Sequence, residues 1–194
     1  MSTLYPDITG YILAGGRSRR FGKDKRQILI GGISLLEKTR RLLVDLLGRE
    51  PFVVGDNLSD LVLDPSTIVP DSRPGCGPLG GLVAALSHSP TVWSLVMAAD
   101  MPFLTIEDLR RLADARAERF DVVALSRTGA PEPLAALYHI RRLHYWHECL
   151  DSGLYSLAKS IKTLDCKTVI LGASSRSLQN INTPDVLDVI ENDL

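Results

Sequence analysis

An apolar run at residues 8–13 leads directly into a glycine-rich, cationic segment at residues 14–26, and this junction limits the possible folds more than any other segment. The run has the length and composition of a buried β-strand. The following segment holds three glycines, one acid and six cations, which are Arg17, Arg19, Arg20, Lys23, Lys25 and Arg26. Glycines let the backbone approach a ligand and turn its N–H groups inward, while cations neutralise several negative charges. The junction therefore predicts a polyphosphate-binding loop at a strand end, with a solvent-facing basic loop as the alternative.

Strand-like and helix-like segments alternate along the rest of the chain. The run Val92–Ala99 is apolar apart from Ser94, as expected for a central strand covered on both faces. Helices are expected to begin at Ser34, where Glu37 would complete a capping box, and at Thr105. Further strands are expected near residues 52–55, 67–69, 122–125, 134–138 and 168–171, and further helices near 77–87, within 140–165 and from Thr183 onward. This alternation predicts an α/β fold, a three-layer sandwich with a mostly parallel, Rossmann-like central sheet, in a single domain over residues 1–194.

The composition argues against several classes of function. Apolar residues make up 45% and charged residues 23% of the chain, and the formal net charge is −1. The cations of residues 14–26 are therefore a local feature of a balanced chain, so nucleic acid is not an expected partner. No apolar run approaches the ~18 residues of a membrane span, and the N-terminus lacks the pattern of a signal peptide. Three cysteines without a C-x-x-C pair, Cys76, Cys149 and Cys166, fit a cytoplasmic protein without a disulfide framework or zinc site.

The unusual polar and glycine-rich segments each follow a predicted strand. They are residues 14–25, 55–57, 71–81 and 100–102. In an open α/β sheet, ligands bind outside the carboxyl ends of the strands. We therefore expect these segments to meet at one edge of the sheet and to form one site from residues far apart in sequence.

Two common phosphate-binding motifs are absent from the first of these segments. A Walker A loop needs four residues between its glycines and then Gly-Lys-Ser/Thr, whereas five residues separate Gly16 from Gly22, and Asp24 follows Lys23. The dinucleotide fingerprint G-x-G-x-x-G is not met either, because Gly15 and Gly16 are adjacent. The pattern therefore disfavours NAD binding and P-loop hydrolysis.

Three side chains in these segments are candidates for chemistry. Asp100 ends the most apolar strand, where a carboxylate can bind Mg²⁺ together with substrate phosphates or, alternatively, cap the next turn. Asp71 can accept hydrogen bonds from a nucleobase or from the backbone of its own turn. Lys25, at the end of the cationic segment, can reach the α- and β-phosphates as a point charge. Together these residues indicate phosphoryl or nucleotidyl transfer.

With these motifs, the chain resembles the molybdenum cofactor guanylyltransferases, which join GMP from GTP to molybdopterin bearing molybdenum. The family pattern Leu-Ala-Gly-Gly-x-Ser-x-Arg-Met-Gly-x-Asp-Lys is met by residues 13–25, with Phe21 in place of Met. That motif alone indicates the wider nucleotidyltransferase superfamily. The matches that continue in the family's order are Gly77–Gly81, Ala99–Pro102, Glu132–Leu134 and Asn180–Pro184.

The resemblance implies a fold of the nucleotide-diphospho-sugar transferase type and a set of site residues. The residues implied to bind GTP are Leu13, Ala14, Gly15, Gly16, Lys25 and Asn57, with Asp71 at the guanine end. Asp100 would bind the Mg²⁺ ion, and the catalytic residues would be Lys25, Asp100 and Arg19. Asn180 and Asn182 would lie near the pterin substrate.

The implied reaction is a direct transfer, in which the terminal phosphate of molybdopterin attacks the α-phosphorus of GTP and pyrophosphate leaves. The resemblance implies no membrane partner, and it implies molybdoenzyme apo-proteins or their chaperones as protein partners. One alternative is a related nucleotidyltransferase that uses CTP or another phosphorylated acceptor. A second alternative is a non-catalytic nucleotide-binding protein that delivers the cofactor. The presence of both Lys25 and Asp100 favours an enzyme.

Overall fold

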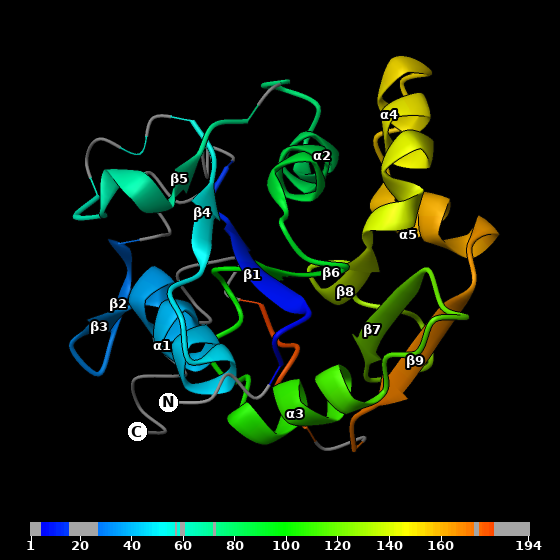
Figure 1. Ribbon diagram of the computed structural model, residues 1–194. Coiled ribbons are helices and arrows are strands. Elements are labelled where there is room, and N and C mark those ends of the chain that lie inside the picture. Colours follow the sequence, from blue (N-terminus) through cyan, green and yellow to red (C-terminus); the bar gives the residue numbers. More distant parts are fainter. Residues whose placement is uncertain are drawn as a thin grey trace.

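The computed structural model describes residues 5–15, 27–56, 58, 61–71, 73–172 and 175–180. Within these residues, seven strands form one sheet in the order β5-β4-β1-β6-β8-β7-β9 (Figure 1). The strands are β1 (Ile8–Leu13), β4 (Phe52–Val54), β5 (Ile68–Val69), β6 (Trp93–Ala98), β7 (Val122–Ser126), β8 (Ala135–His139) and β9 (Cys166–Ile170). A separate antiparallel hairpin consists of β2 (Leu29–Ile30) and β3 (Ile33–Ser34).

The sheet is mostly parallel, as predicted, with one reversed strand. The four neighbours β5, β4, β1 and β6 run parallel, and β7 pairs parallel with β9. In contrast, β8 pairs antiparallel with both β6 and β7. Because β8 is reversed, the residues that precede it lie at the same edge of the sheet as the residues that follow β1, β6, β7 and β9.

Helices cover both faces of the sheet and produce the predicted three layers (Figure 1). Successive side chains of a strand point to opposite faces, and β1 shows the consequence. Ile12 belongs to the core under α1 (Leu35–Leu47) and α3 (Ile106–Asp114), whereas Tyr11 belongs to the core under α2 (Pro78–His88) and α4 (Leu143–Asp151). The remaining helical segments are α5 (Leu157–Ser160) and the 3₁₀ turns Pro65–Thr67, Ile140–Arg142 and Ile161–Thr163.

Local capping signals set the starts of α1 and α3. The hydroxyl of Ser34 accepts a hydrogen bond from the N–H of Glu37 at 3.2 Å, as predicted. The predicted capping box also needs a hydrogen bond from the Ser34 N–H to the Glu37 side chain. Instead, the Glu37 carboxylate pairs with Arg40 and Arg41 at 2.7 Å each. At α3 both halves of a capping box are present, between Thr105 and Asp108.

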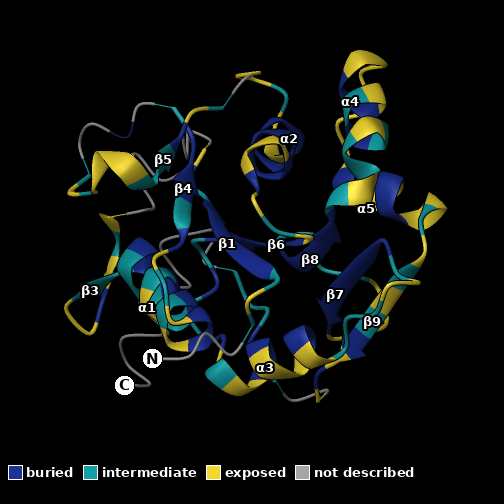
Figure 2. Cartoon of the chain, viewed as in Figure 1, coloured by how far each residue is buried: buried dark blue, intermediate teal, exposed yellow. Residues whose placement is uncertain are grey.

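The prediction of a central strand is confirmed in β6. All six of its residues are buried, and Figure 2 shows the strands of the sheet as a mainly buried layer between half-exposed helices. Residues 93–98 have neighbouring strands on both sides as well as helices on both faces. In the part of the chain that the structure describes, no helix combines the length and apolar character needed to cross a membrane.

Candidate active site

The carboxyl ends of four parallel neighbours bring the predicted segments to one edge of the sheet. Ala14 and Gly15 follow β1, Gly55 follows β4, Asp71 lies two residues after β5, and Asp100 lies two residues after β6. Leu13 is the last residue of β1 and is half-buried. The predicted site residues Gly16, Arg19, Lys25, Asn57 and Asn182 lie outside the described residues.

The backbone of Ala14–Gly15 lies directly against Gly55. The N–H of Ala14 donates to the carbonyl of Val54 at 2.8 Å, so β1 and β4 stay together beyond their ladder. A Cβ atom added at Gly55 would lie 3.0 Å from the nitrogen of Gly15, whereas one added at Gly15 would meet no atom within 4 Å. Gly55 therefore permits the close approach of two chain segments, and the exposed Gly15 presents open backbone surface at the edge.

Asp71 lies against the first turn of α2. Its Oδ1 accepts a hydrogen bond from the N–H of Arg73 at 2.9 Å. The carboxylate therefore bonds the backbone of its own turn, which was one of the two roles predicted for it from the sequence. A Cβ atom added at Gly80 would lie 2.7 Å from the same oxygen. The absence of a side chain at Gly80 thus makes room for the Asp71 carboxylate. The adjacent Arg73 guanidinium pairs with Asp151 of α4 at 2.6 Å.

A second carboxyl group accompanies Asp100 at this edge. The N–H of Ala98 donates to the carbonyl of Leu134 at 2.9 Å, which extends the antiparallel pairing of β6 with β8 toward Glu132. Leu134 also donates its N–H to Oε1 of Glu132 at 3.1 Å. Burial raises the pKa of Glu132, and the negative charge of Asp100 raises it further. The hydrogen bond from the Leu134 N–H lowers this pKa and so offsets part of the rise. The two acids are therefore within electrostatic reach of each other.

Sequence reasoning did not identify Glu132 as a site residue, although it lies in a quoted motif. Its place depends on the reversal of β8, which puts the start of that strand beside the end of β6. A parallel β8 would have carried Glu132 to the opposite edge. The raised pKa of a carboxyl group beside another acid is a signal that only the three-dimensional structure contains.

Residues 175–180 also contact this edge of the sheet, although they follow β9, the strand at the other end of the strand order from β5. Just beyond the end of β9, the N–H of Leu171 donates to the carbonyl of Ser126, the last residue of β7, at 2.8 Å. The guanidinium of Arg176 lies 4.2 Å from the ring centroid of Phe103, three residues after Asp100. Asn180 is half-buried, and its buried Oδ1 has no hydrogen-bond partner in the described structure. Such an atom is a candidate for a ligand contact.

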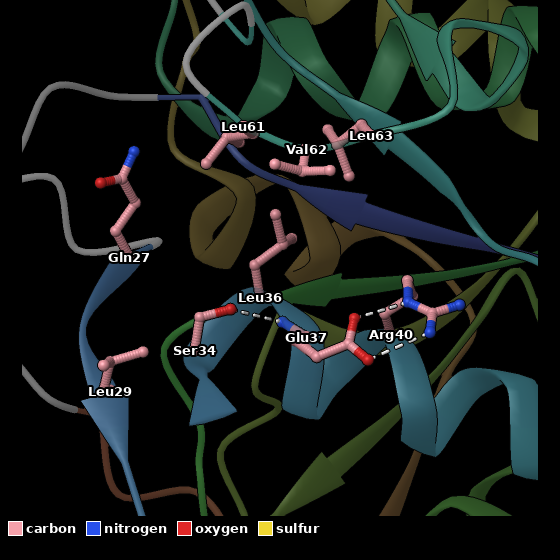
Figure 3. Close-up of a pocket in the computed structure, with 9 residues that line it drawn as sticks. All are labelled: Gln27, Leu29, Ser34, Leu36, Glu37, Arg40, Leu61, Val62 and Leu63. Atoms are coloured by element: carbon pink, nitrogen blue, oxygen red, sulfur yellow. Dashed lines mark hydrogen bonds and ion pairs between the residues drawn. The ribbon is translucent and has the colours of Figure 1, made fainter. Parts of the chain in front are cut away.

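A cavity of about 500 Å³ lies apart from these residues, between the start of α1 and the segment 61–63 (Figure 3). Its walls combine apolar side chains with the Glu37–Arg40 ion pair. The hydrogen bond from Arg40 lowers the pKa of Glu37 to about 2, despite the opposing effect of burial, and the bond from Arg41 adds to the lowering. The lining residues are Gln27, Leu29, Ser34, Leu36, Glu37, Arg40, Leu61, Val62 and Leu63, and none is a predicted site residue. The cavity therefore does not mark the predicted chemistry.

Comparison with known proteins shows which family of enzymes this chain resembles. Residues 10–166 match the family model described as the MobA-like NTP transferase domain. A protein of Chloroflexus aggregans named "Probable molybdenum cofactor guanylyltransferase" is 33% identical over 95% of this chain and 93% of its own length. A protein of Deinococcus radiodurans with the same name is 33% identical over 91% of this chain and 90% of its own length.

Solved structures support the same fold. The crystal structure of molybdopterin-guanine dinucleotide biosynthesis protein A from Archaeoglobus fulgidus superposes with a TM-score of 0.74. The match covers 95% of this chain and 97% of the other chain at 24% sequence identity. At this level of identity the likeness establishes the fold, which is that of the nucleotide-diphospho-sugar transferases, as expected.

Proposed function

Because the chain belongs to the MobA-like NTP transferase family, we propose that it transfers GMP from GTP to the terminal phosphate of molybdopterin bearing molybdenum. An oxygen of the acceptor phosphate attacks the α-phosphorus of GTP, and the bond from that phosphorus to the bridging oxygen of the β-phosphate breaks. Pyrophosphate leaves, and the product is a guanine dinucleotide. The observation that carries the proposal is the convergence of Ala14–Gly15, Asp71 and Asp100 at one sheet edge.

The chemistry needs alignment more than it needs a strong base. The acceptor oxygen already belongs to an anionic phosphate, so no side chain has to activate it, and none of the proposed site residues is a cysteine or histidine. The open backbone at Gly15 and the cationic segment that contains Lys25 would hold the triphosphate. Asp71 would contact the guanosine end, and Asn180 and Asn182 would contact the pterin. The protein thus offsets the repulsion between two polyanions.

The residues at the end of β6 fit a magnesium ion. Asp100 is a half-buried carboxylate beside Glu132, and the described residues contain no cluster of three or more metal-ligating side chains. This donor set matches Mg²⁺, which is usually held by one or two carboxylates together with waters and substrate phosphates. We infer that Asp100 holds the ion, which when bound would neutralise charge on the reacting phosphates.

The base specificity provides the first test of this function. Isothermal titration of the protein with GTP, CTP and ATP, each with and without Mg²⁺, is expected to show selective GTP binding that Mg²⁺ strengthens. The second candidate, a cytidylyl enzyme, is kept because phosphate contacts cannot distinguish bases, and a preference for CTP would establish it. Failure of all three nucleotides to bind would contradict both.

Gly80→Ala is expected to weaken GTP binding by about tenfold, corresponding to ~1.4 kcal/mol. A glycine-to-alanine change inside a helix normally stabilises a protein by ~0.5–1 kcal/mol. Here the added methyl group would lie 2.7 Å from Oδ1 of Asp71 and would displace that carboxylate. Titration with Mg-GTP measures the affinity, and thermal unfolding shows that the variant is folded. An unchanged affinity would remove Asp71 from the guanosine contact.

The proposed setting of the enzyme is the cytoplasm. Cys76, Cys149 and Cys166 carry free thiols, and cytoplasmic proteins usually keep their cysteines in this reduced form. Molybdoenzyme apo-proteins or their chaperones remain the proposed protein partners, since the product is a cofactor that such enzymes consume.

A further inference from the structure

We propose that Arg176 binds the terminal phosphate of the acceptor, on the opposite side of Asp100 from the nucleotide. This inference rests on the proposed function and adds a residue on the acceptor side. The reaction brings together two polyanions, and the cations assigned so far, Lys25 and Arg19, both belong to the cationic segment 14–26 of the sequence. A phosphate acceptor needs a cation of its own to approach a triphosphate.

The strands that lead to the proposed nucleotide contacts and the strand that leads to Arg176 lie on different sides of β6 in the sheet. The proposed nucleotide contacts follow β1 and β5, which lie on one side of β6. The segment of Arg176 comes from the other side of β6, because it follows β9, beyond β8 and β7, and its guanidinium reaches Phe103, which follows β6. Asn180, which the proposed function assigns to the pterin, lies four residues later in the same segment. One short segment thus carries both proposed acceptor contacts.

The backbone of this segment is anchored around Arg176. The N–H of Gln179 donates to the carbonyl of Arg176 at 2.8 Å, which closes a turn. The side chain of Leu178 packs against the core on the α1 and α3 face. The hydroxyl of Ser175 donates to that of Ser177 at 2.7 Å and accepts from the Ser177 N–H at 3.2 Å. The base of the Arg176 side chain is therefore fixed relative to the sheet edge.

The guanidinium is oriented by contacts that include a ring stack and a hydrogen bond. Its carbon lies 4.2 Å from the centroid of the Phe103 ring, and its Nε donates to Oε1 of Gln179 at 3.2 Å. Stacking engages the face of a guanidinium, whereas its hydrogen bonds to phosphate run in its plane, so both contacts can exist together. Phe103 belongs to the turn Met101–Leu104, which directly follows Asp100 and is closed by a hydrogen bond from the N–H of Leu104 to the carbonyl of Met101 at 3.4 Å. The stack therefore holds the cation beside the loop of the proposed magnesium ligand.

Arg176→Met tests this role, because methionine keeps much of the side chain's length and apolar contact but removes the charge. Arg176→Lys keeps the charge but loses the planar, bidentate geometry. Arg119→Met is the matched control. Arg119 is also an exposed arginine stacked on a phenylalanine, with 4.5 Å to the ring of Phe120, but it precedes β7 and lies at the opposite edge of the sheet.

The first measurement is the kinetics of GMP transfer to molybdopterin, together with titration of Mg-GTP. Arg176→Met is expected to raise the KM for molybdopterin at least tenfold and to change the Kd of Mg-GTP by less than twofold. Arg176→Lys should give an intermediate KM, and Arg119→Met should match the unmodified protein. An unchanged KM in Arg176→Met would overturn the proposal, as would an equal rise in Arg119→Met. A comparable loss of GTP affinity would instead place Arg176 on the nucleotide side.

A second measurement does not depend on the identity of the acceptor. Inorganic phosphate is titrated into protein saturated with Mg²⁺ and the α,β-methylene analogue of GTP, which cannot be cleaved at that bond. The unmodified protein is expected to bind phosphate, and Arg176→Met is expected to bind it at least fivefold more weakly. Equal phosphate binding in both proteins, or none in either, contradicts the role of Arg176. If phosphate binding depends on Arg176 but molybdopterin is not a substrate, the proposed function fails and the phosphate subsite stands.

Discussion

Asp100→Ala is expected to lower turnover by a factor of about 10³ or more, corresponding to ~4 kcal/mol of transition-state stabilisation. The carboxylate follows the buried strand β6 and is the proposed ligand of Mg²⁺. Without it, the reacting phosphates would lose the cation that neutralises charge during transfer. Nucleotide binding should fall less than turnover, because the proposed phosphate contacts of the residues after β1 do not depend on Asp100. Single-turnover kinetics and GTP titration with and without Mg²⁺ measure the two effects separately.

Two further variants sharpen the Asp100 experiment. Asp45→Ala removes an exposed carboxylate from the later part of α1, and it should leave turnover and Mg²⁺ dependence unchanged. Glu132→Gln keeps the shape of the neighbouring side chain but removes its charge, and it should weaken Mg²⁺ binding less than Asp100→Ala does. Near-normal turnover in Asp100→Ala would remove Asp100 from the metal site.

Lys25→Ala is expected to raise the Kd of GTP, or to lower turnover, by about 10²-fold, corresponding to ~2.7 kcal/mol. We propose that Lys25 serves as a positioned point charge for the α- and β-phosphates. Lys25 lies outside the described residues, but β1, the strand that precedes it in the sequence, ends at Leu13, at the proposed site. Titration of GTP and steady-state kinetics distinguish an effect on binding from an effect on the transfer step.

The control for Lys25 is Lys167→Ala, which removes an exposed lysine from β9. Three strands, β6, β8 and β7, lie between β1 and β9 in the sheet. This variant should bind GTP as the unmodified protein does. If Lys25→Ala also behaves normally, the loop after β1 holds phosphate through its backbone alone, and the catalytic role of Lys25 is wrong.

Local sequence signals predicted most of the secondary structure. The apolar run 8–13 is strand β1 with the same bounds, and the caps Ser34 and Thr105 begin their helices as expected. These signals are local because a strand needs a run of apolar side chains and a helix start needs an acceptor for its first N–H groups. Glu37 shows where such reasoning fails. Two nearby arginines attract its carboxylate away from the helix start, and a capping pattern does not record that competition.

Some residues of the candidate site could be predicted from the sequence, and others could not. Ala14–Gly15, Asp71 and Asp100 could be predicted because each follows a strand, and parallel strands present their carboxyl ends at one edge. Glu132 and Arg176 could not be placed from the sequence. The first depends on the antiparallel pairing of β8 with β6, and the second on a stack with Phe103 across 73 positions. Strand direction and long-range packing follow from how the whole core is filled, which no local pattern encodes.

The amino-acid sequence by itself therefore determined the class of fold, the strand ends that form the candidate site, and the family to which this protein belongs. These properties depend on hydrophobic periodicity and on short motifs, in which each residue acts through its near neighbours. Only the tertiary structure decided which acid lies within electrostatic reach of Asp100, which glycine makes room for Asp71, and which arginine stacks on Phe103. Those relations depend on the reversal of one strand and on contacts between distant segments, because side chains far apart in sequence meet only after the sheet has formed.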